Sequence, residues 1–377
     1  MKKFLLIFLH IFFVVNLSAQ EMSFEDYDPP STLVVPEHNL THAKYPFIDV
    51  HNHQWNVPNQ DLKLLANQMD SLNMAVMVNL SGRGFNRVMN PDSTFRFEMN
   101  EINYLQNSVN KINATIPGRV ITFTNINFNG IGEKGWTERE VKVLEAAVKA
   151  GAKGLKIFKG LGMSTKDNAG KRVAIDDTRL DPIWAKCGEL GIPVLIHAAD
   201  PFQFWQPHDK NNERWYELKE IPGRKRNPNV DPSFEQIISE QHNIFRKHPG
   251  TKFINAHLGW YGNDLAALGK LMDELPNMYT EIGAVIAELG RQPRYAKEFL
   301  TKYQDRVMFG KDTWAPHEYY LYFRILETDD DYIKYFRKRH AFWRLYGLNL
   351  PDEVLKKIYY KNALNVISGI DKTLFPD

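Results

Sequence analysis

The chain has 377 residues, of which 43% are hydrophobic, and this is enough to bury a large core in one big domain or two small ones. Its formal net charge of +2 gives no electrostatic reason to expect a nucleic-acid partner. The single cysteine, Cys187, excludes an intrachain disulfide.

The first residues have the pattern of a secretory signal peptide. Lys2 and Lys3 precede an apolar run from Phe4 to Val15, and the small residues Ser18 and Ala19 follow it. A membrane anchor is the alternative, but the run is shorter than the roughly 20 residues that a span needs. We therefore expect residues 1–19 to be removed and the protein to be exported, periplasmic or secreted, with no membrane contact after cleavage.

Residues 20–44 are polar and contain three prolines, so we expect a leader that covers the surface of a domain formed by residues 45–377. From residue 45 the chain repeats a short apolar run, a polar loop and a stretch with helical spacing. The expected strands are Phe47–His51, Ala75–Leu80, Val120–Asn125, Gly154–Phe158, Pro193–His197, Lys252–Ala256, Met278–Ile282 and Val307–Phe309. The expected helices are Asp61–Leu72, Glu98–Ala114, Glu138–Ala150, Arg179–Leu190, Pro232–Lys247 and Asp264–Glu274.

Alternation of strands and helices predicts an α/β fold with a parallel sheet. Eight such units fit a (β/α)8 TIM barrel, whose usual size is about 250 residues plus insertions. A doubly wound open sheet is the alternative fold. The absence of a Gly-x-Gly-x-x-Gly motif after the first strand argues against the dinucleotide-binding version of that fold.

Two loops after expected strands are long. Residues 198–231 contain several aromatic residues and the basic run Arg224-Lys225-Arg226, and residues 311–350 are also rich in aromatic residues. Loops that follow barrel strands form the active face, and long ones commonly act as lids or substrate walls.

Polar side chains stand where the apolar runs end. The sequence Asp49-Val50-His51-Asn52-His53 closes the first strand, and its two histidines are spaced so that both point to one face. His197, His257 and Asp312 follow the fifth, sixth and eighth strands. Because a barrel gathers the carboxyl ends of all its strands, we expect these five side chains to converge.

Imidazole and carboxylate groups suit Zn²⁺ and related divalent ions such as Mn²⁺. A site in which three or four such ligands leave one position open is catalytic rather than structural. The sequence therefore predicts a divalent metal ion at the carboxyl end of the barrel.

The strand-end motifs resemble those of the amidohydrolase superfamily. Within it, the pattern is similar to the amidohydrolase-related group that includes aminocarboxymuconate-semialdehyde decarboxylase-like enzymes and sugar-lactone or dicarboxylate-lactone hydrolases. The resemblance runs from about Phe47 to Ile367 and rests on these motifs: Ile48-Asp49-Val50-His51-Asn52-His53, Pro193-Val194-Leu195-Ile196-His197-Ala198, Ala256-His257-Leu258-Gly259-Trp260, Phe309-Gly310-Lys311-Asp312 and Ile358-Tyr359-Tyr360-Lys361-Asn362-Ala363.

The resemblance implies roles for the strand-end residues. It makes His51, His53, His197 and Asp312 the ligands of one metal ion, with Asp312 also holding or deprotonating a metal-activated water. It makes His257 a nearby acid/base or a weaker ligand. In binuclear relatives a lysine at the position of Lys156 is carboxylated and bridges two metals, whereas the motifs here resemble the single-metal group.

Other residues near the expected barrel mouth are candidates for substrate binding. Arg83 follows the second strand between glycines and could hold a carboxylate in a two-pronged grip, or it could be a solvated loop charge. The remaining candidates are Trp55, Lys156, His208, Trp260, Arg291 and Trp314.

Three functions stay open at this point. The first is a metal-dependent hydrolase acting on a small carbonyl substrate such as a lactone or an amide. The second is a metal-dependent non-oxidative decarboxylase of an aromatic or unsaturated acid, a lyase. The third is a non-catalytic barrel that binds a ligand. Export favours the hydrolase, the partner is a small molecule, and a homodimer is compatible with the group that the sequence resembles.

Overall fold

The computed structural model describes residues 22–89 and 95–376, in two units that comprise residues 1–35 and 36–377. The expected signal peptide, residues 1–19, lies outside the described residues. In the first unit, a turn is closed by a hydrogen bond from the Tyr27 amide to the Ser23 carbonyl at 3.1 Å. All further description concerns the second unit.

Eight strand positions lie where the sequence predicted them. The strands are β1 (Phe47–Asn52), β2 (Met74–Asn79), β5 (Val120–Thr122) with β6 (Thr124–Asn125), β7 (Leu155–Ile157), β8 (Val194–Ile196), β9 (Phe253–Asn255), β10 (Met278–Glu281) and β11 (Val307–Met308). Each pairs in parallel with its neighbour, in the orders β1-β2-β5 and β6-β7-β8-β9-β10-β11. Nearly every strand residue is buried, as expected for parallel strands covered on both sides.

Backbone hydrogen bonds connect the two strand groups. Phe123 separates β5 from β6 and donates its amide to the Asn79 carbonyl of β2 at 2.9 Å. At the other end, the Val50 amide of β1 donates to Phe309, which follows β11, at 3.0 Å. A parallel bridge between Asn52 and Asp312 lies next to that bond. The first and last strands therefore meet, and the expected (β/α)8 architecture is confirmed.

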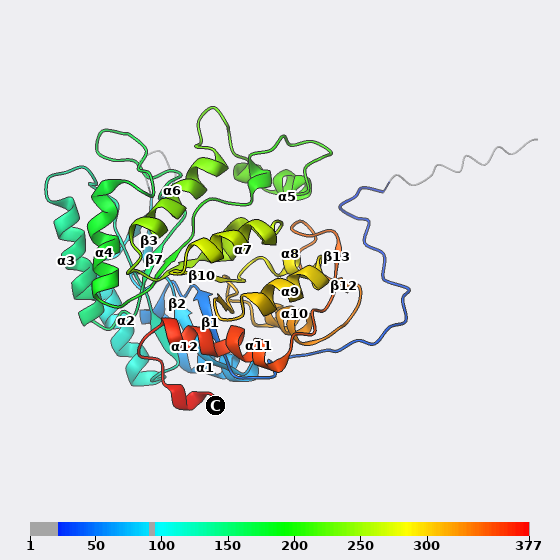
Figure 1. The fold of residues 1–377 in the computed structure, drawn as a ribbon. Helices are drawn as coiled ribbons and strands as arrows, with labels where there is room; N and C mark the ends of the chain where they lie inside the picture. The colour runs from blue at the N-terminus through cyan, green and yellow to red at the C-terminus, as the bar shows by residue number, and fades with distance from the viewer. Residues whose placement is uncertain (1–21, 90–94, 377) are drawn as a thin grey trace, which may run out of the picture. The chain divides into compact units, whose positions relative to one another are not determined.

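Helices cover the strands. The longer ones are α1 (Leu62–Ser71), α2 (Ile102–Thr115), α3 (Trp136–Lys149), α4 (Asp181–Glu189), α6 (Phe234–Lys247), α7 (Leu265–Glu274), α9 (Pro293–Lys302) and α10 (Pro316–Glu327). Helices α3 and α4 lie side by side (Figure 1). Asp61, Ser233 and Asp264 begin α1, α6 and α7 by accepting a backbone amide hydrogen, which satisfies one of the free donors of the first turn.

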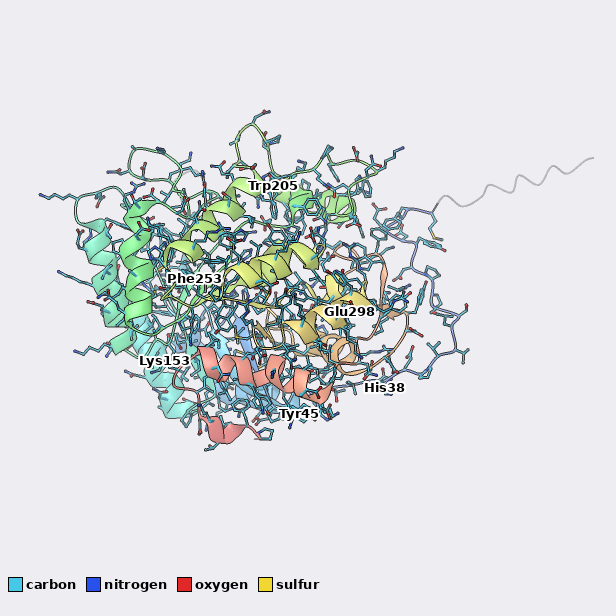
Figure 2. All side chains as sticks on the ribbon, in the orientation of Figure 1. His38, Tyr45, Lys153, Trp205, Phe253 and Glu298 are labelled. Carbon is cyan, nitrogen blue, oxygen red and sulfur yellow. The ribbon has the colours of Figure 1, made fainter. Side chains whose placement is uncertain are left out.

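The space between strands and helices is filled by side chains, among them the fully buried Phe253 of β9 (Figure 2). The short helices are α5 (Trp215–Glu220), α8 (Ile286–Gly290), α11 (Asp352–Lys356) and α12 (Asn362–Val366). The Asn362 side chain donates to the carbonyl oxygens of Gln304 and Val307, each at 2.7 Å, so α12 anchors the start of β11. Within the described ranges, no helix combines the length and apolar character that crossing a membrane requires.

One segment differs from the expectation. The helix predicted from Glu98 begins at Ile102, because β4 (Phe95–Met99) pairs antiparallel with β3 (Phe85–Met89). The sequence Phe-Arg-Phe-Glu-Met alternates apolar and polar residues, which is the periodicity of a strand. The loop after β2 thus carries a hairpin.

The second half of the expected leader contacts the barrel. The Ala43 amide donates to the Leu72 carbonyl at 3.1 Å, and His38 Nδ1 lies 2.5 Å from a carboxylate oxygen of Asp330. Residues 36–44 are therefore attached to the domain that follows them, while a domain boundary at residue 45 stays a prediction.

Candidate metal centre

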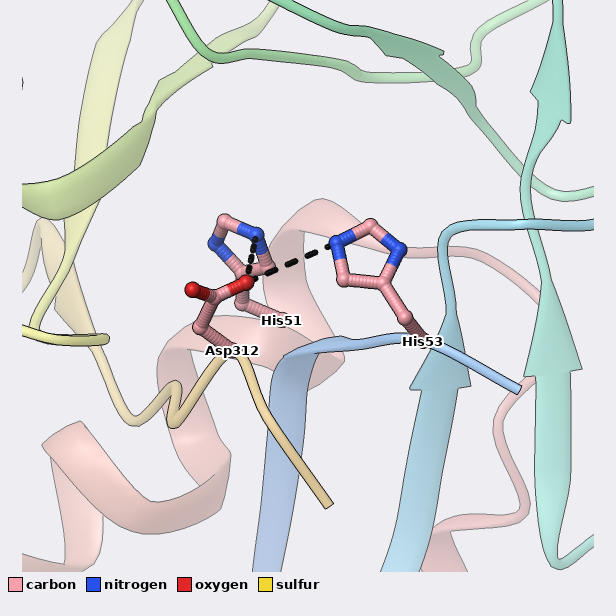
Figure 3. Close-up of side chains that lie close together, drawn as sticks. All are labelled: His51, His53 and Asp312. Atoms are coloured by element: carbon pink, nitrogen blue, oxygen red, sulfur yellow. Dashed lines mark ion pairs between the residues drawn. The ribbon is translucent and has the colours of Figure 1, made fainter. Parts of the chain in front are cut away.

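His51, His53 and Asp312 come together at the carboxyl ends of β1 and β11. A carboxylate oxygen of Asp312 lies 3.4 Å from His51 Nε2 and 3.6 Å from His53 Nε2. Figure 3 shows both imidazole rings directed toward that one oxygen. The three donor atoms lie within 4.8 Å of one another, which is close enough for one ion to contact all of them.

His197 and His257 follow β8 and β9, at the same end of the barrel as His51, His53 and Asp312. Their rings are 4.5 Å apart, and His257 Nε2 is 3.3 Å from His197 Nδ1. His257 Nδ1 is 2.8 Å from the Gly283 carbonyl, which can only accept, so Nδ1 carries a hydrogen.

The hydrogen-bond pattern fits a metal ion. His51 places Nδ1 at 2.8 Å from Glu281, and His53 places Nδ1 at 2.7 Å from the Ser81 hydroxyl, so each turns Nε2 toward Asp312. Among the described residues, neither His51 Nε2 nor His197 Nε2 has a hydrogen-bond partner, although both atoms are buried. Buried polar atoms are normally satisfied, and a bound ion would satisfy these two.

Glu281, at the end of β10, orients two of the histidines. Its carboxylate accepts His51 Nδ1–H and, at 2.7 Å, the His257 amide, while its other oxygen accepts the Gly283 amide at 2.5 Å. Gly310 makes room for this carboxylate, because a Cβ at residue 310 would lie 3.0 Å from both Glu281 Cδ and His51 Cβ.

The backbone around two of the candidate ligands is unusual. Asp312 has φ 84°, and His257, Leu258 and Trp260 have φ of 58°, 54° and 61°. Left-handed conformations cost non-glycine residues about 1–3 kcal/mol each and persist where surrounding structure imposes them. Here the Asp312 amide donates to the His51 carbonyl at 2.6 Å and the His257 amide donates to Glu281, which holds both turns.

Burial controls the charges of the centre. It holds the pKa of His51 and His197 well below the ordinary value and lowers that of His53 to about 3, so all three rings are neutral and able to bind a cation. Burial opposes ionisation of Asp312, but His51, His257 and His53 outweigh it and hold the pKa of Asp312 below its usual value. Asp312 is therefore ionised.

Lys156 is buried below the histidines. Its Nζ has no hydrogen-bond partner among the described residues and lies 5.6 Å from the centroid of the Phe158 ring. Burial lowers the pKa of Lys156 to about 8.

A pocket of about 190 Å³ adjoins the centre. Asp312, His197 and His257 form its inner side together with Trp260, whose Nε1 donates to the Ala198 carbonyl at 3.0 Å. Its outer side comes from both long loops, through Arg214, Glu217, Arg224, Tyr335, Arg337 and His340. Both long loops therefore contribute side chains to the pocket lining, and their role as substrate walls stays a prediction.

Two of the predicted substrate-binding tryptophans lie at the centre. Trp260 lines the pocket, with its ring 4.7 Å from the ring of His257. Trp55 stacks on His53 at 4.9 Å with an interplanar angle of 8°, and it is 49% exposed, so its ring is accessible beside a candidate ligand.

The other candidates do not line this pocket. Arg83 is buried and donates to the Asn100 carbonyl at 2.8 Å and the Asn125 carbonyl at 3.3 Å. Arg291 lines a separate groove and forms an ion pair with Glu288 at 2.8 Å. His208 Nε2 is 2.9 Å from the Trp215 carbonyl, and Trp314 donates to the Gln68 side chain at 3.3 Å. Their assignment to substrate binding stays a prediction.

Sequence reasoning missed Glu281 and Asp49. The Asp49 carboxylate is buried and accepts the amides of His51 and Lys311 and the hydroxyl of Tyr319, at 3.0, 3.1 and 2.6 Å. Burial raises the pKa of Asp49 to about 7. Glu281 lies next to the end of the predicted strand Met278–Ile282, a position similar to those of His197 and His257, but the sequence does not show which residue it would contact.

Comparisons with known proteins agree with this geometry. The sequence profile of the family described as Amidohydrolase matches residues 48–367. No curated protein sequence matches the chain.

Two solved structures share the fold. A TIM-barrel protein from Bordetella bronchiseptica has 12% identity and a TM-score of 0.51, covering 85% of this chain and 98% of its own. A Staphylococcus aureus protein, named as a candidate amidohydrolase, has 16% identity and a TM-score of 0.51, covering 86% and 100%. The profile match includes every candidate metal-binding residue and most of the barrel, so this chain belongs to the amidohydrolase family.

Proposed function

We propose that this protein is a metal-dependent hydrolase acting on a small carbonyl compound such as a lactone or an amide. The observation that carries the proposal is the convergence of His51, His53 and ionised Asp312 beside a pocket, where buried nitrogens of His51 and His197 have no hydrogen-bond partner among the described residues. His51, His53, His197 and Asp312 would hold one divalent ion. Zn²⁺ is the first candidate, because imidazole and carboxylate are among its usual ligands.

When bound, the ion polarises the substrate carbonyl and brings the pKa of a water molecule near neutrality. Asp312 then acts as the general base: its carboxylate is ionised and 33% exposed, so it can accept the proton of an attacking water. His257 faces the same pocket and is the acid/base that handles the proton of the leaving group. Glu281 keeps His51 and His257 in place throughout.

We also propose that the protein is exported and acts on a small molecule outside the cytoplasm. The residues that support this are the charged, apolar and small residues of positions 1–19.

The test combines metal analysis with a substrate panel. Protein purified without added metal should contain about one divalent ion per chain, and it should release acid from sugar lactones or simple amides. Asp312→Asn should lower turnover by about a hundredfold or more, since a general base contributes that much. Asp331→Asn, an exposed aspartate on a different groove, is the matched control and should leave turnover unchanged.

Three outcomes would contradict the proposal. If Asp312→Asn retained both metal and turnover, its assigned role would be wrong. Release of CO₂ from aromatic or unsaturated acids, without acid release from lactones or amides, would identify a decarboxylase instead. A bound ion without turnover of any panel member would favour a ligand-binding barrel.

A further inference from the structure

The lining of the pocket holds more cationic than acidic side chains: Lys159, Arg214, Arg224, Lys311 and Arg337 against Asp200, Glu217 and Asp312. Three carboxylates in or next to the pocket are each shared by two cations. The three groups are Asp200 with Lys159 and Arg226, Glu217 with Arg214 and Arg224, and Glu318 with Lys311 and Arg337. Arg214 also pairs with Glu288, which is shared with Arg291, and Arg291 pairs in turn with Glu213. The lining of the pocket nevertheless holds more cationic than acidic side chains.

Two of the arginines that line the pocket keep unused donors. Arg224 uses only Nη1, which contacts Glu217 and His340, and its side chain is 36% exposed. Arg337 gives Nε and Nη2 to Glu318, at 3.2 and 2.8 Å, and its side chain is 29% exposed. In the part of the chain that the structure describes, Arg224 Nε and Nη2 and Arg337 Nη1 have no protein acceptor. Both arginines line the pocket that Asp312 and His257 also line.

The two arginines come from different loops. Arg224 belongs to the loop after β8 and Arg337 to the loop after β11, and both loops are held in place by buried acids, Glu217 and Glu318. Guanidinium groups fixed in this way are preorganised to form charge-assisted hydrogen bonds with an anion.

We propose that Arg224 and Arg337, which line the same pocket as Lys159, bind an anionic group of the substrate, a carboxylate in the simplest case. This rests on the proposed function, and it makes the substrate a carbonyl compound that also carries an acid. The metal centre holds the reacting carbonyl at one side of the pocket while the arginines hold the acid at the other.

The test compares two lactones that differ by one charged group. D-glucarolactone carries a carboxylate where D-gluconolactone carries a hydroxymethyl group. Binding is measured by calorimetry on chelator-treated protein, so the readout does not depend on turnover. Wild-type protein should bind D-glucarolactone at least about tenfold more tightly. Arg224→Gln should weaken that binding by about tenfold to a hundredfold, as loss of a charged hydrogen bond predicts, and leave D-gluconolactone unchanged.

Matched variants separate binding from folding. Arg294→Gln removes an exposed arginine from the separate groove and should change neither affinity. Arg224→Lys keeps the charge beside Glu217 and should restore part of the preference, which a purely structural role would not predict. Equal affinity for both lactones, or no binding of D-glucarolactone, would overturn the proposal.

The experiments can contradict the proposed hydrolase function and the proposed anion-binding subsite of Arg224 and Arg337 independently. If metal-loaded protein cleaves the two lactones equally well, the hydrolase stands and the subsite does not. If chelator-treated protein prefers D-glucarolactone but the loaded protein cleaves neither lactone, the subsite stands and the hydrolase does not.

Discussion

Glu281 is the residue whose contacts bear most directly on the metal centre. Glutamine at residue 281 could still accept from His51 and His257 through one oxygen, but its NH₂ group would face the Gly283 amide, which is also a donor. The resulting shift of His51 should lower metal affinity by about tenfold to a hundredfold, the usual effect of losing a group that orients a ligand.

Competition with a chromogenic chelator would measure this effect of Glu281→Gln. Glu240→Gln is the control, because Glu240 is also buried and hydrogen bonded, to Arg172, but lies outside the centre. Equal loss of metal affinity in both variants would show that the effect is general destabilisation rather than orientation of His51.

Several side chains that the structure brings together could be singled out in the sequence by residue type alone. His51, His53, His197, His257 and Asp312 stand out because imidazoles and an aspartate close several apolar strands. Glu281 occupies the same kind of position, yet its function depends on the Nδ1 atom of a histidine 230 residues away. That pairing is created by the fold, so no local pattern could reveal it.

At the scale of elements, the contact between β1 and the segment after β11 depends on Gly310, which has no side chain. Gly310→Ala would place a Cβ against Glu281 and His51, so the segment after β11 would have to move away from β1. We expect this variant to lose the metal centre. Its free energy of unfolding should fall by roughly 1–3 kcal/mol, the usual cost of overpacking, so it should unfold at a lower denaturant concentration.

Metal content and a urea unfolding curve would check the Gly310→Ala prediction. Gly250→Ala is the matched control, because a Cβ at residue 250 meets nothing within 4 Å and its φ is not positive. A fully metallated Gly310→Ala protein of wild-type stability would show that the strand contact tolerates displacement.

Helices and strands were predictable where the hydrophobic periodicity agreed with the turn and loop residues that bound each segment. The expected strands and the six expected helices match because buried parallel strands are short apolar runs and the helices between them are amphipathic; α9 and α10 were not among the expected helices. The β3–β4 hairpin was missed because its second strand runs almost directly into α2, and only pairing with Phe85–Met89 distinguishes the two.

For the whole molecule, buried histidines make stability depend on pH. Burial and the neighbouring Arg246 lower the pKa of His242 to about 4, whereas the unfolded chain takes up this proton near the ordinary value of 6.5. The contribution of His242 is therefore complete above about pH 6.5 and is lost as pH falls toward 4. Between about pH 7 and pH 5 the loss should be about 2 kcal/mol.

Unfolding free energies of wild type and His242→Phe at these two pH values would test this prediction. The fall on acidification should be smaller in the variant. His340 acts in the same direction, since its pKa is lowered to about 3, but it is present in both proteins and cancels in the comparison. An identical fall in both proteins would show that His242 does not titrate as described.

Closure of the strand ring has a consequence for how this protein is made. His51 is supplied by the first strand and Asp312 by the segment after the last one, and the two are joined by backbone hydrogen bonds. A growing chain therefore cannot assemble the centre until nearly the whole barrel has been synthesised. Binding of the proposed ion would therefore require the complete barrel, and a truncated chain should remain free of metal.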